Sequence, residues 1–447
     1  MPAAPVPPSA PLPFLQYVRT ARSNPIAAFH ADIYRQPIVE MSPWKLHIFI
    51  VSDPAAIRHI LIDNAANYIK GSIEPRIGSA SSSEDFTATE KWRDRRRIMS
   101  SIVDYRLNAG NSSIILESVQ SLLARWNALP SGTVIDISAE MSQLALEIIS
   151  RLVFSSDRGE ITSVMERTFA RNEVDPLFSL LDFFPLLEQP RAAFKRFRTH
   201  KRFRALTATI DRLITKRICE KTLNRDDLLA RLMREQNTAT GQPLSRKDIH
   251  AQIITAVGAG HHTVALALTW IWYLLSLHPA EEARLHAELH SVLDQPPEVT
   301  DISRLPCTRM LIDESLRLYP PVPVMAWRRA RADDEVCGVK ILRGATITIA
   351  PWVLHRHTKL WDHPELFEPQ RFSPACTHAR SRYAYLPFGT GPRVCIGAAF
   401  AMMEMTLILA TIAQRFRLRV LPGHPVEPQG LVTLRPRYGI KATLERR

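Results

Sequence analysis

The sequence FGTGPRVCIG, residues 388–397, is the part of the chain that decides the fold. Gly389 and Gly391 permit backbone angles and a close approach that a Cβ would forbid, and Pro392 stiffens the loop. A helix is predicted to begin directly after Gly397, and its N-terminal partial positive charge favours a thiolate at Cys395. The loop therefore predicts a shaped site in which a sulfur anion binds a metal.

The alternative is that Cys395 is only a small buried apolar residue, as most single cysteines are. The other cysteines are scattered and form neither a CxxC pair nor a disulfide framework: Cys219, Cys307, Cys337 and Cys376. Around Cys395, however, several positions fit one purpose. Arg393 supplies a cation for an anionic cofactor group, and Gly397 lets a flat ring lie against the start of the helix.

This loop closely resembles the cysteine-loop signature of the cytochrome P450 superfamily, at Phe388, Gly391, Arg393, Cys395 and Gly397. The resemblance extends from about Lys45 to the C-terminus. It implies a mainly helical fold with a small β part. It also implies one haem b between a long central helix and the cysteine-loop helix, with Cys395 as the iron ligand and Phe388, Arg393 and Gly397 around the cofactor. The implied activity is that of a soluble, bacterial-type haem-thiolate monooxygenase.

The rest of the chain predicts one domain, residues 15–447, after a flexible proline-rich lead-in, residues 1–14. The expected elements are a strand within 45–53 followed by a helix, a long loop over 71–90, an unusually long helix over 245–277, a helix after Pro279, a helix over 306–318, two short strands around a glycine turn within 340–351 and a last helix over 398–416.

Glu314 and Arg317 form an ExxR pair, whose spacing of three places both side chains on one helix face. Such pairs are common on solvated helices, but here the surrounding sequence is apolar on one side, which favours a buried pair with a further partner. Arg371 is the expected partner. The resemblance implies that the three form a structural network behind the cysteine loop, with a role in folding and haem retention.

Trp92 and Arg96 stand at i and i+4 in WRDRRR, so one indole N–H and one guanidinium share a face that suits a carboxylate. The resemblance implies that they bind the haem propionates. Arg329 is a further propionate candidate by position, and the neighbouring Arg328 leaves that choice open. An exposed basic face is the interpretation for the other arginines of WRDRRR.

The long helix carries AGHHTV, residues 259–264. Small residues at 259 and 260 leave room for a diatomic ligand, and the Thr263 hydroxyl can contact bound oxygen. In the resembled family an acid precedes this threonine and a second hydroxyl follows it. Here His262 and Val264 take those places. Histidine can relay protons near neutral pH, but it can equally be a structural hydrogen bonder or a substrate contact, so both roles for His262 stay open.

The expected pocket walls are mostly apolar and favour a hydrophobic small-molecule substrate. They include the segments 71–90 and 176–187 and the residues Ala259, Val322, Val324 and Val432. A terpenoid, a steroid, a fatty acid and an aromatic compound fit this composition equally well. Ordinary core packing is the alternative for the phenylalanines and leucines of 176–187.

Lys and Arg exceed Asp and Glu by 57 to 44, a net charge of +13, yet no nucleic-acid motif is present. No apolar run has the length and continuity of a membrane span, and the expected location is cytoplasmic, as a monomer. Electrons are expected from a ferredoxin or flavodoxin with its reductase. That partner is expected to dock on Arg93, Arg95, Arg97 and Arg393.

Three other functions remain open at this point. A peroxygenase would take hydrogen peroxide directly, although the presence of Thr263 counts against it. A haem-thiolate isomerase, lyase or phenol-coupling enzyme keeps the cysteine loop but need not insert oxygen. A non-catalytic haem sensor would bind ligands without substrate-coupled reduction. The expected reaction is insertion of one oxygen atom from O2, most often as a hydroxylation.

Overall fold

The computed structural model describes residues 1–41, 47–70, 96–100, 111–155, 158–170, 188–222, 224–236 and 241–447. Its helices are α1 Phe14–Ser23, α2 Pro54–Arg58, α5 Ser112–Asn127, α6 Ile137–Phe154, α7 Arg158–Ala170, α8 Glu188–Cys219, α9 Leu228–Arg234, α10 Arg246–Leu277, α11 Pro279–Val292, α12 Pro306–Leu318, α13 Pro351–Leu354, α14 Pro374–Ala379 and α15 Ala398–Ala413. Its strands are β1 Ile38–Met41, β2 Ile48–Val51, β3 Tyr68–Lys70, β4 Val134–Asp136, β5 Met325–Ala330, β6 Asp334–Val336, β7 Val339–Ile341, β8 Thr346–Ile349, β9 Phe416–Val420, β10 Pro428–Gly430, β11 Leu434–Pro436 and β12 Lys441–Arg446.

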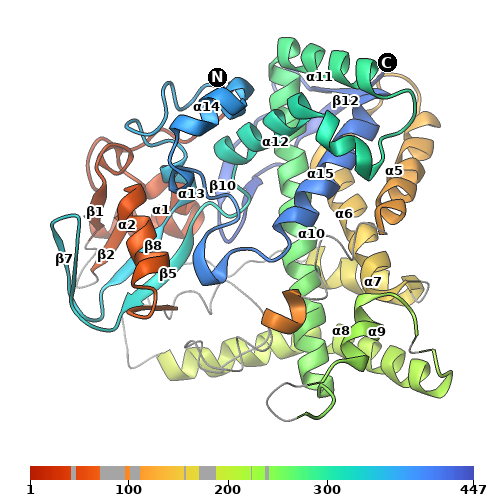
Figure 1. Ribbon diagram of the computed structural model, residues 1–447, viewed down its shortest axis with the longest axis horizontal. Coiled ribbons are helices and arrows are strands. Elements are labelled where there is room, and N and C mark those ends of the chain that lie inside the picture. The colour runs from red at the N-terminus through yellow and green to blue at the C-terminus, as the bar shows by residue number, and fades with distance from the viewer. Residues whose placement is uncertain are drawn as a thin grey trace.

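Helix α10 organises the molecule. Figure 1 shows it running through the middle, with the strand-rich part on one side and α5, α6 and α7 on the other. Its C-terminal half is buried on nearly all sides; there Trp270 stacks on Tyr319 with ring centroids 4.1 Å apart. The indole N–H of Trp270 donates to the carbonyl of Leu434 at 2.9 Å. This half of α10 belongs to the main hydrophobic core.

The strand-rich part is a five-stranded sheet in the order β1-β2-β8-β5-β3, with small sheets β4-β12-β9, β10-β11 and β6-β7 beside it. Strands β2 and β8 are parallel and nearly wholly buried, as expected for strands covered on both faces. Strand β5 pairs with β8 through a register irregularity between Met325 and Arg328.

Several predicted elements are confirmed with their boundaries. Ser245 caps α10 by accepting from the N–H of Asp248 at 3.1 Å, and Pro279 opens α11 directly after α10 ends. Helix α12 spans 306–318 as predicted. The strand predicted within 45–53 is β2. Asp53 follows it and caps α2 by accepting from two backbone N–H groups at 2.9 Å. The predicted loop over 71–90 lies outside the described residues.

Two elements differ in detail from the prediction. Helix α15 ends at Ala413, and Phe416, which continues the apolar pattern, begins strand β9 instead. The two strands within 340–351 are β7 and β8, but they do not pair with each other. Gly344, at φ +88°, turns the chain between them so that β8 joins the large sheet while β7 pairs with β6.

The proline-rich segment before α1 contacts the body of the protein. The N–H of Ala3 donates to the hydroxyl of Tyr273 at 3.1 Å, and the carbonyl of Ala3 accepts from the hydroxyl of Tyr319 at 2.7 Å. The carbonyl of Pro8 accepts from the N–H of Ala31 at 2.8 Å. The division of the chain after residue 14 stays a prediction.

Helix α10 is also the one helix, among the described residues, with the length and hydropathy to cross a membrane. A little over half of its most apolar window, 56%, is buried inside the protein. Its apolar character is therefore explained by its place in the core.

Candidate active site

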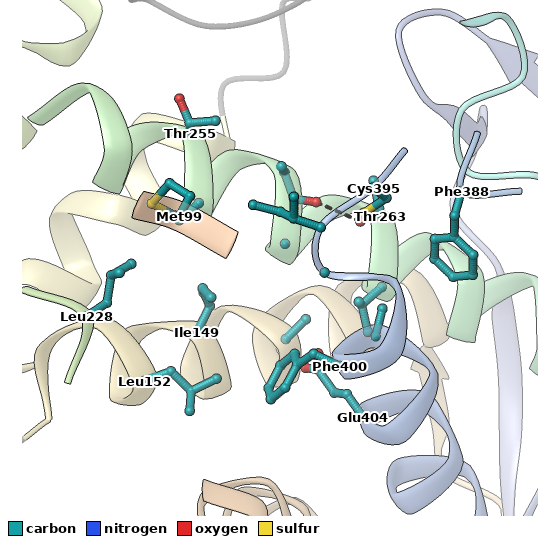
Figure 2. Close-up of a pocket in the computed structure, with 18 of the residues that line it drawn as sticks. Met99, Ile149, Leu152, Leu228, Thr255, Thr263, Phe388, Cys395, Phe400 and Glu404 are labelled. Carbon is teal, nitrogen blue, oxygen red and sulfur yellow. Dashed lines mark hydrogen bonds between the residues drawn. The ribbon is translucent and has the colours of Figure 1, made fainter. Parts of the chain in front are cut away.

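A cavity of about 650 Å³ lies between α10, α6 and the cysteine loop. Figure 2 shows Thr263 on α10 and Cys395 on the loop among the residues that form its wall, together with Phe400 and Glu404 of α15. Most of the wall is apolar, and the volume lies within the range of small-molecule sites. Two chain segments far apart in the sequence thus meet at one cavity.

The cysteine loop is closed by its own backbone. The N–H of Cys395 donates to the carbonyl of Phe388 at 2.9 Å, and the N–H of Val394 donates to the carbonyl of Gly391 at 3.1 Å. Gly391 has φ +73°, and a Cβ at this position would overlap the carbonyl oxygen of Leu61. The glycine is needed both for its backbone conformation and for this close approach.

The electrostatic surroundings of Cys395 act in two directions. Its side chain is exposed on the cavity wall, yet the surrounding protein is dense enough that burial raises the pKa of the thiol. A hydrogen bond from the backbone N–H of Gly397 and the charge of Arg96 lower the pKa. The backbone donor at the helix start matches the expectation for a sulfur anion, and metal coordination removes the remaining proton from such a thiol.

Glu314 and Arg317 form a buried ion pair with two parallel hydrogen bonds of 2.7 Å, and both side chains are fully buried. Arg317 also donates to the carbonyls of His355, Pro364 and Leu366 at 2.7–2.9 Å. The guanidinium of Arg371 lies 3.6 Å from the same Glu314 carboxylate. The structure therefore brings the three residues of the predicted network together.

His355 connects this network to the cysteine loop, a link that the sequence analysis missed. Its Nε2 accepts from the backbone N–H of Leu386 at 2.9 Å, and its Nδ1 lies 3.3 Å from the carbonyl of Arg317. Burial and the neighbouring Arg317 lower the pKa of His355 well below its usual value, so the ring is neutral. A neutral ring with its proton on Nδ1 satisfies both contacts.

The predicted propionate ligands lie in different settings. Arg96 and Arg393 line the cavity, and Arg96 donates to the carbonyl of Val394 at 2.6 Å, which ties residues 96–100 to the cysteine loop. On β5, Arg328 is only 7% exposed, whereas Arg329 is exposed, with its guanidinium beside Gly344. Successive residues of a strand face opposite sides, so the strand distinguishes a buried arginine from an exposed one; the sequence alone did not show which was which. Trp92 lies outside the described residues.

Thr263 lines the cavity, and its hydroxyl donates to the carbonyl of Ala259 at 2.6 Å, the dashed line in Figure 2. His262 is not among the residues of the wall. Its ring lies 4.2 Å from the ring of His261 and 6.1 Å from that of Phe169. Burial lowers the pKa of His261 to about 3, so this ring is neutral; its Nε2 lies 2.9 Å from the hydroxyl of Ser142.

The predicted pocket residues divide into two groups. Ala259 and Val322 line the cavity. Val324, which is buried, and Val432, which is half-buried, pack in the main core and are not part of the described wall. The segment 176–187 lies outside the described residues, as does 71–90. The sequence analysis missed Glu404, a buried carboxyl on the wall, because an acid inside an apolar helix gave no separate signal.

A family model for cytochrome P450 matches residues 5–442 of the chain. The chain belongs to the cytochrome P450 family. As a P450, it is an enzyme of the monooxygenase class with a haem cofactor. Its reaction requires O2 and electrons from a redox partner. The sequence resemblance is thereby confirmed over nearly the whole chain.

Three relatives are similar over most of their length. Pentalenene oxygenase of Streptomyces avermitilis is 37% identical over 76% of this chain and 75% of its own. Cyclooctatin synthase of Streptomyces melanosporofaciens is 32% identical over 89% and 86%. Cyclooctat-9-en-7-ol 5-monooxygenase of the same organism is 30% identical over 86% and 83%. All three come from bacteria.

The residues around the cavity of this P450 fit a haem group. Cys395 offers a single sulfur ligand, and small residues of α10, Ala259 and Gly260, leave room on the wall. Arg96 and Arg393 offer cations for carboxylates. Among the described residues there is no cluster of three or more His, Cys, Asp or Glu side chains that could hold a metal ion.

We predict that Glu314→Gln lowers the free energy of unfolding by about 3–5 kcal/mol, because it leaves the buried Arg317 without its carboxylate. Haem retention should fall as well, since Arg317 holds the segment that leads into the cysteine loop. Urea unfolding and the haem-to-protein absorbance ratio measure the two effects.

The matched control is Glu281→Gln, which removes the partner of the largely exposed Arg284 from a pair of the same spacing. Its loss should be about 0.5 kcal/mol or less. Equal losses of unfolding free energy in the two variants would show that the Glu314 pair contributes no more to stability than a surface contact does.

Proposed function

We propose that this P450 hydroxylates a cyclic apolar substrate, with Cys395 as the proximal ligand of haem b and O2 as the oxygen source. The supporting observation is the mostly apolar cavity whose wall contains both the loop cysteine and the α10 threonine. When bound, haem with a thiolate ligand supplies the electron density that favours cleavage of the O–O bond. The residues of the chain provide binding, orientation and protons.

Holding the cofactor is the first task of these residues. Phe388 and Gly397 lie on the cavity wall beside Cys395, and the backbone N–H of Gly397 supports the sulfur. Arg96 and Arg393 are the proposed partners of the propionates, together with Trp92. Of the two arginines on β5, burial favours Arg328 over Arg329 for this role, because a guanidinium shielded from solvent binds a carboxylate more strongly.

Thr263 is the proposed contact for bound oxygen. Its hydroxyl hydrogen is engaged with the carbonyl of Ala259, so the lone pairs of its oxygen remain to accept a hydrogen bond from water or a protonated ligand. His262 stays a candidate relay acting through water from behind the wall. In this arrangement the threonine positions the proton carrier at the reacting oxygen.

The proposed substrate class is a cyclic terpene. One relative is named for pentalenene and another for cyclooctat-9-en-7-ol. A mostly apolar wall binds a hydrocarbon skeleton by burial of its surface, and the few polar groups orient it. Ala259 of α10 and Val322 of the segment before β5 are the proposed substrate contacts. Val324 and Val432 are proposed to support the wall from the core behind it.

We predict that the reduced protein with carbon monoxide shows the strongly red-shifted Soret band of a thiolate-ligated carbonyl, and that Cys395→Ala abolishes it. The alanine removes the only proposed sulfur ligand while leaving the loop backbone intact. Difference spectroscopy makes the measurement, with Cys307→Ala as the control because Cys307 lies on α12, away from the cavity wall. A folded protein with a histidine-type carbonyl spectrum would contradict the proposal.

We predict that cyclic terpene hydrocarbons convert the ferric protein to high spin, and that linear fatty acids of equal carbon number bind at least about tenfold more weakly. Val322→Phe should weaken terpene binding about tenfold by filling the cavity. Leu342→Phe, at an exposed turn, is the matched control and should bind as wild type. Titration of the Soret band with each ligand measures these affinities. Tighter binding of the fatty acid than of the terpene would exclude cyclic terpenes as the substrate class.

A separate ferredoxin or flavodoxin, served by its reductase, is the proposed electron donor. Arg97 is exposed on the segment tied to the cysteine loop through Arg96, and Arg393 lies in that loop. With Arg93 and Arg95, which lie outside the described residues, they are the proposed docking site for an acidic surface. We propose that this reaction takes place in the cytoplasm and that the protein acts as a monomer.

We predict that the bimolecular rate of reduction falls steeply with added salt and falls about tenfold or more in Arg93→Glu/Arg97→Glu, because charge attraction sets the encounter rate. Arg343→Glu, a charge reversal at the exposed turn after β7, should have little effect. Stopped-flow reduction by a purified acidic ferredoxin measures the rates. Rates that ignore both salt and these reversals would remove the docking site from the proposal.

A further inference from the structure

The face of α10 that lines the cavity carries polar side chains at two places. Thr263 is at one of them, and Gln252 and Thr255 are at the other, toward the N-terminus of the helix. Ala256 and Ala259 lie on the wall between them. A rise of 1.5 Å per residue places Gln252 about three turns, or about 16 Å, from Thr263 along the helix axis. This wall is therefore polar at both ends of an apolar stretch.

The end of the cavity at Gln252 is distant from the cysteine. Figure 2 shows Thr255 and Leu228 on one side of the cavity, and Cys395 and Phe388 on the other. Leu228 belongs to α9, which packs against the same part of α10. A cofactor bound at Cys395 lies at the opposite end, so the end at Gln252 is left to the part of the substrate farthest from the iron.

Gln252 is a buried polar side chain without a partner. Only 8% of the residue is exposed, yet no hydrogen bond joins its amide to any described residue. An amide carries two N–H donors and one carbonyl acceptor, and leaving them unsatisfied in a buried site is costly. Its place on the cavity wall indicates that a bound molecule can supply the missing partner.

Thr255, one turn further along α10, offers the complementary group. Its hydroxyl donates to the carbonyl of Ala251 at 2.7 Å, so only the lone pairs of its oxygen remain for a ligand. Side chains three positions apart on a helix are neighbours, which places this acceptor beside the Gln252 amide. The two residues together can donate a hydrogen bond to a ligand and accept one from it.

The charged residues beside Leu228 are already paired. Asp227 binds Arg217 through hydrogen bonds of 2.7 and 2.8 Å, and Asp226 accepts from Arg231 at 2.9 Å. Because a guanidinium neutralises each carboxylate, neither pair favours a charged ligand. This end of the cavity therefore suits a neutral group that both accepts and donates a hydrogen bond, and an alcohol is such a group.

We infer that the substrate of this P450 already carries a hydroxyl group, which accepts from the amide of Gln252 and donates to the oxygen of Thr255. The opposite end of the carbon skeleton is then the part oxidised, near Thr263. The inference rests on the proposed monooxygenase function. It makes the enzyme a later oxygenase, whose substrate is supplied by an earlier hydroxylation or by a ring closure that ends with the addition of water.

The reaction is then the conversion of an alcohol into a diol. A carbon–hydrogen bond of the substrate breaks, and one atom of O2 enters between the carbon and the hydrogen. The other oxygen atom leaves as water, with two electrons from the redox partner and two protons from solvent. The hydroxyl already present is bound by the protein and is unchanged in the product.

The first experiment compares the binding of three diterpenes that share one tricyclic skeleton: abietadiene, abietadienol and abietic acid. Titration of the Soret band gives the three affinities. The alcohol should bind about tenfold or more tightly than the hydrocarbon, because only the alcohol satisfies the buried amide. The acid is ionised at neutral pH and has no hydrogen to donate to Thr255, so it should bind no more tightly than the hydrocarbon.

Gln252→Leu keeps the approximate size of the side chain and removes the amide. It should bind the alcohol about tenfold more weakly than wild type and the hydrocarbon at least as tightly, so that the preference disappears. Thr255→Val removes the acceptor and should lower the preference about threefold. Gln414→Leu makes the same chemical change at the end of α15, away from the cavity wall, and should keep the wild-type preference. All three variants should retain the wild-type CO spectrum.

The second measurement locates the new oxygen atom in the product. Wild type should convert abietadienol mainly into one diol, whose new hydroxyl lies at the end of the skeleton away from the existing one, because the bound hydroxyl fixes the orientation. Gln252→Leu should form several diols, since the substrate is no longer held at one end. Mass spectrometry and NMR of the products distinguish the two results.

Equal affinities of wild type for the hydrocarbon and the alcohol overturn the inference, as does an unchanged preference in Gln252→Leu. Tighter binding of the acid than of the alcohol would assign this end of the cavity to an anionic group instead. Loss of the thiolate-type CO spectrum in wild type would strike the proposed function itself. Calorimetric titration would still show whether the protein distinguishes the alcohol from the hydrocarbon.

Discussion

The fully buried guanidinium of Arg317 is the interaction on which the rest of the site depends. It binds the Glu314 carboxylate with two hydrogen bonds and three backbone carbonyls from the segment 355–366. A buried cation is tolerated only when it is paired and its donors are satisfied, so the segment must adopt the one path that supplies these carbonyls. His355, held by the same segment, then fixes the N–H of Leu386 at the entrance of the cysteine loop.

One half of helix α10 packs in the hydrophobic core, and the other half lines the cavity. Toward its C-terminus, Trp270 and its neighbours are enclosed by aromatic and aliphatic side chains. In its middle, small residues and Thr263 form part of the cavity wall. Because packing in the buried half positions the helix as a rigid rod, Thr263 is held at a defined place on the cavity wall.

Much of this arrangement could be predicted from local sequence. Capping at Ser245, the proline at 279 and the glycines of the cysteine loop all act through neighbouring backbone atoms, and their elements lie where they were predicted. The ExxR spacing pointed to the pair of Glu314 and Arg317 for the same reason. The family and its cofactor followed from the loop around Cys395.

What could not be predicted depends on contacts between distant segments. Whether Arg328 or Arg329 faces inward is set by the register of β5, which includes an irregularity. The direction of the His262 ring depends on Phe169 of another helix. The burial of Glu404 on the cavity wall could not be predicted, because it results from the way α5, α10 and α12 pack on α15 and not from the residues next to it.

The contact between Gly391 and the carbonyl of Leu61 joins parts of the chain that leave the ribosome at very different times. Leu61 is synthesised long before Cys395, because it lies far earlier in the chain. The sulfur-bearing loop can take its final shape only against that early segment. Cofactor capture is therefore a late event in biogenesis, and an incompletely translated chain has no ligand site to offer.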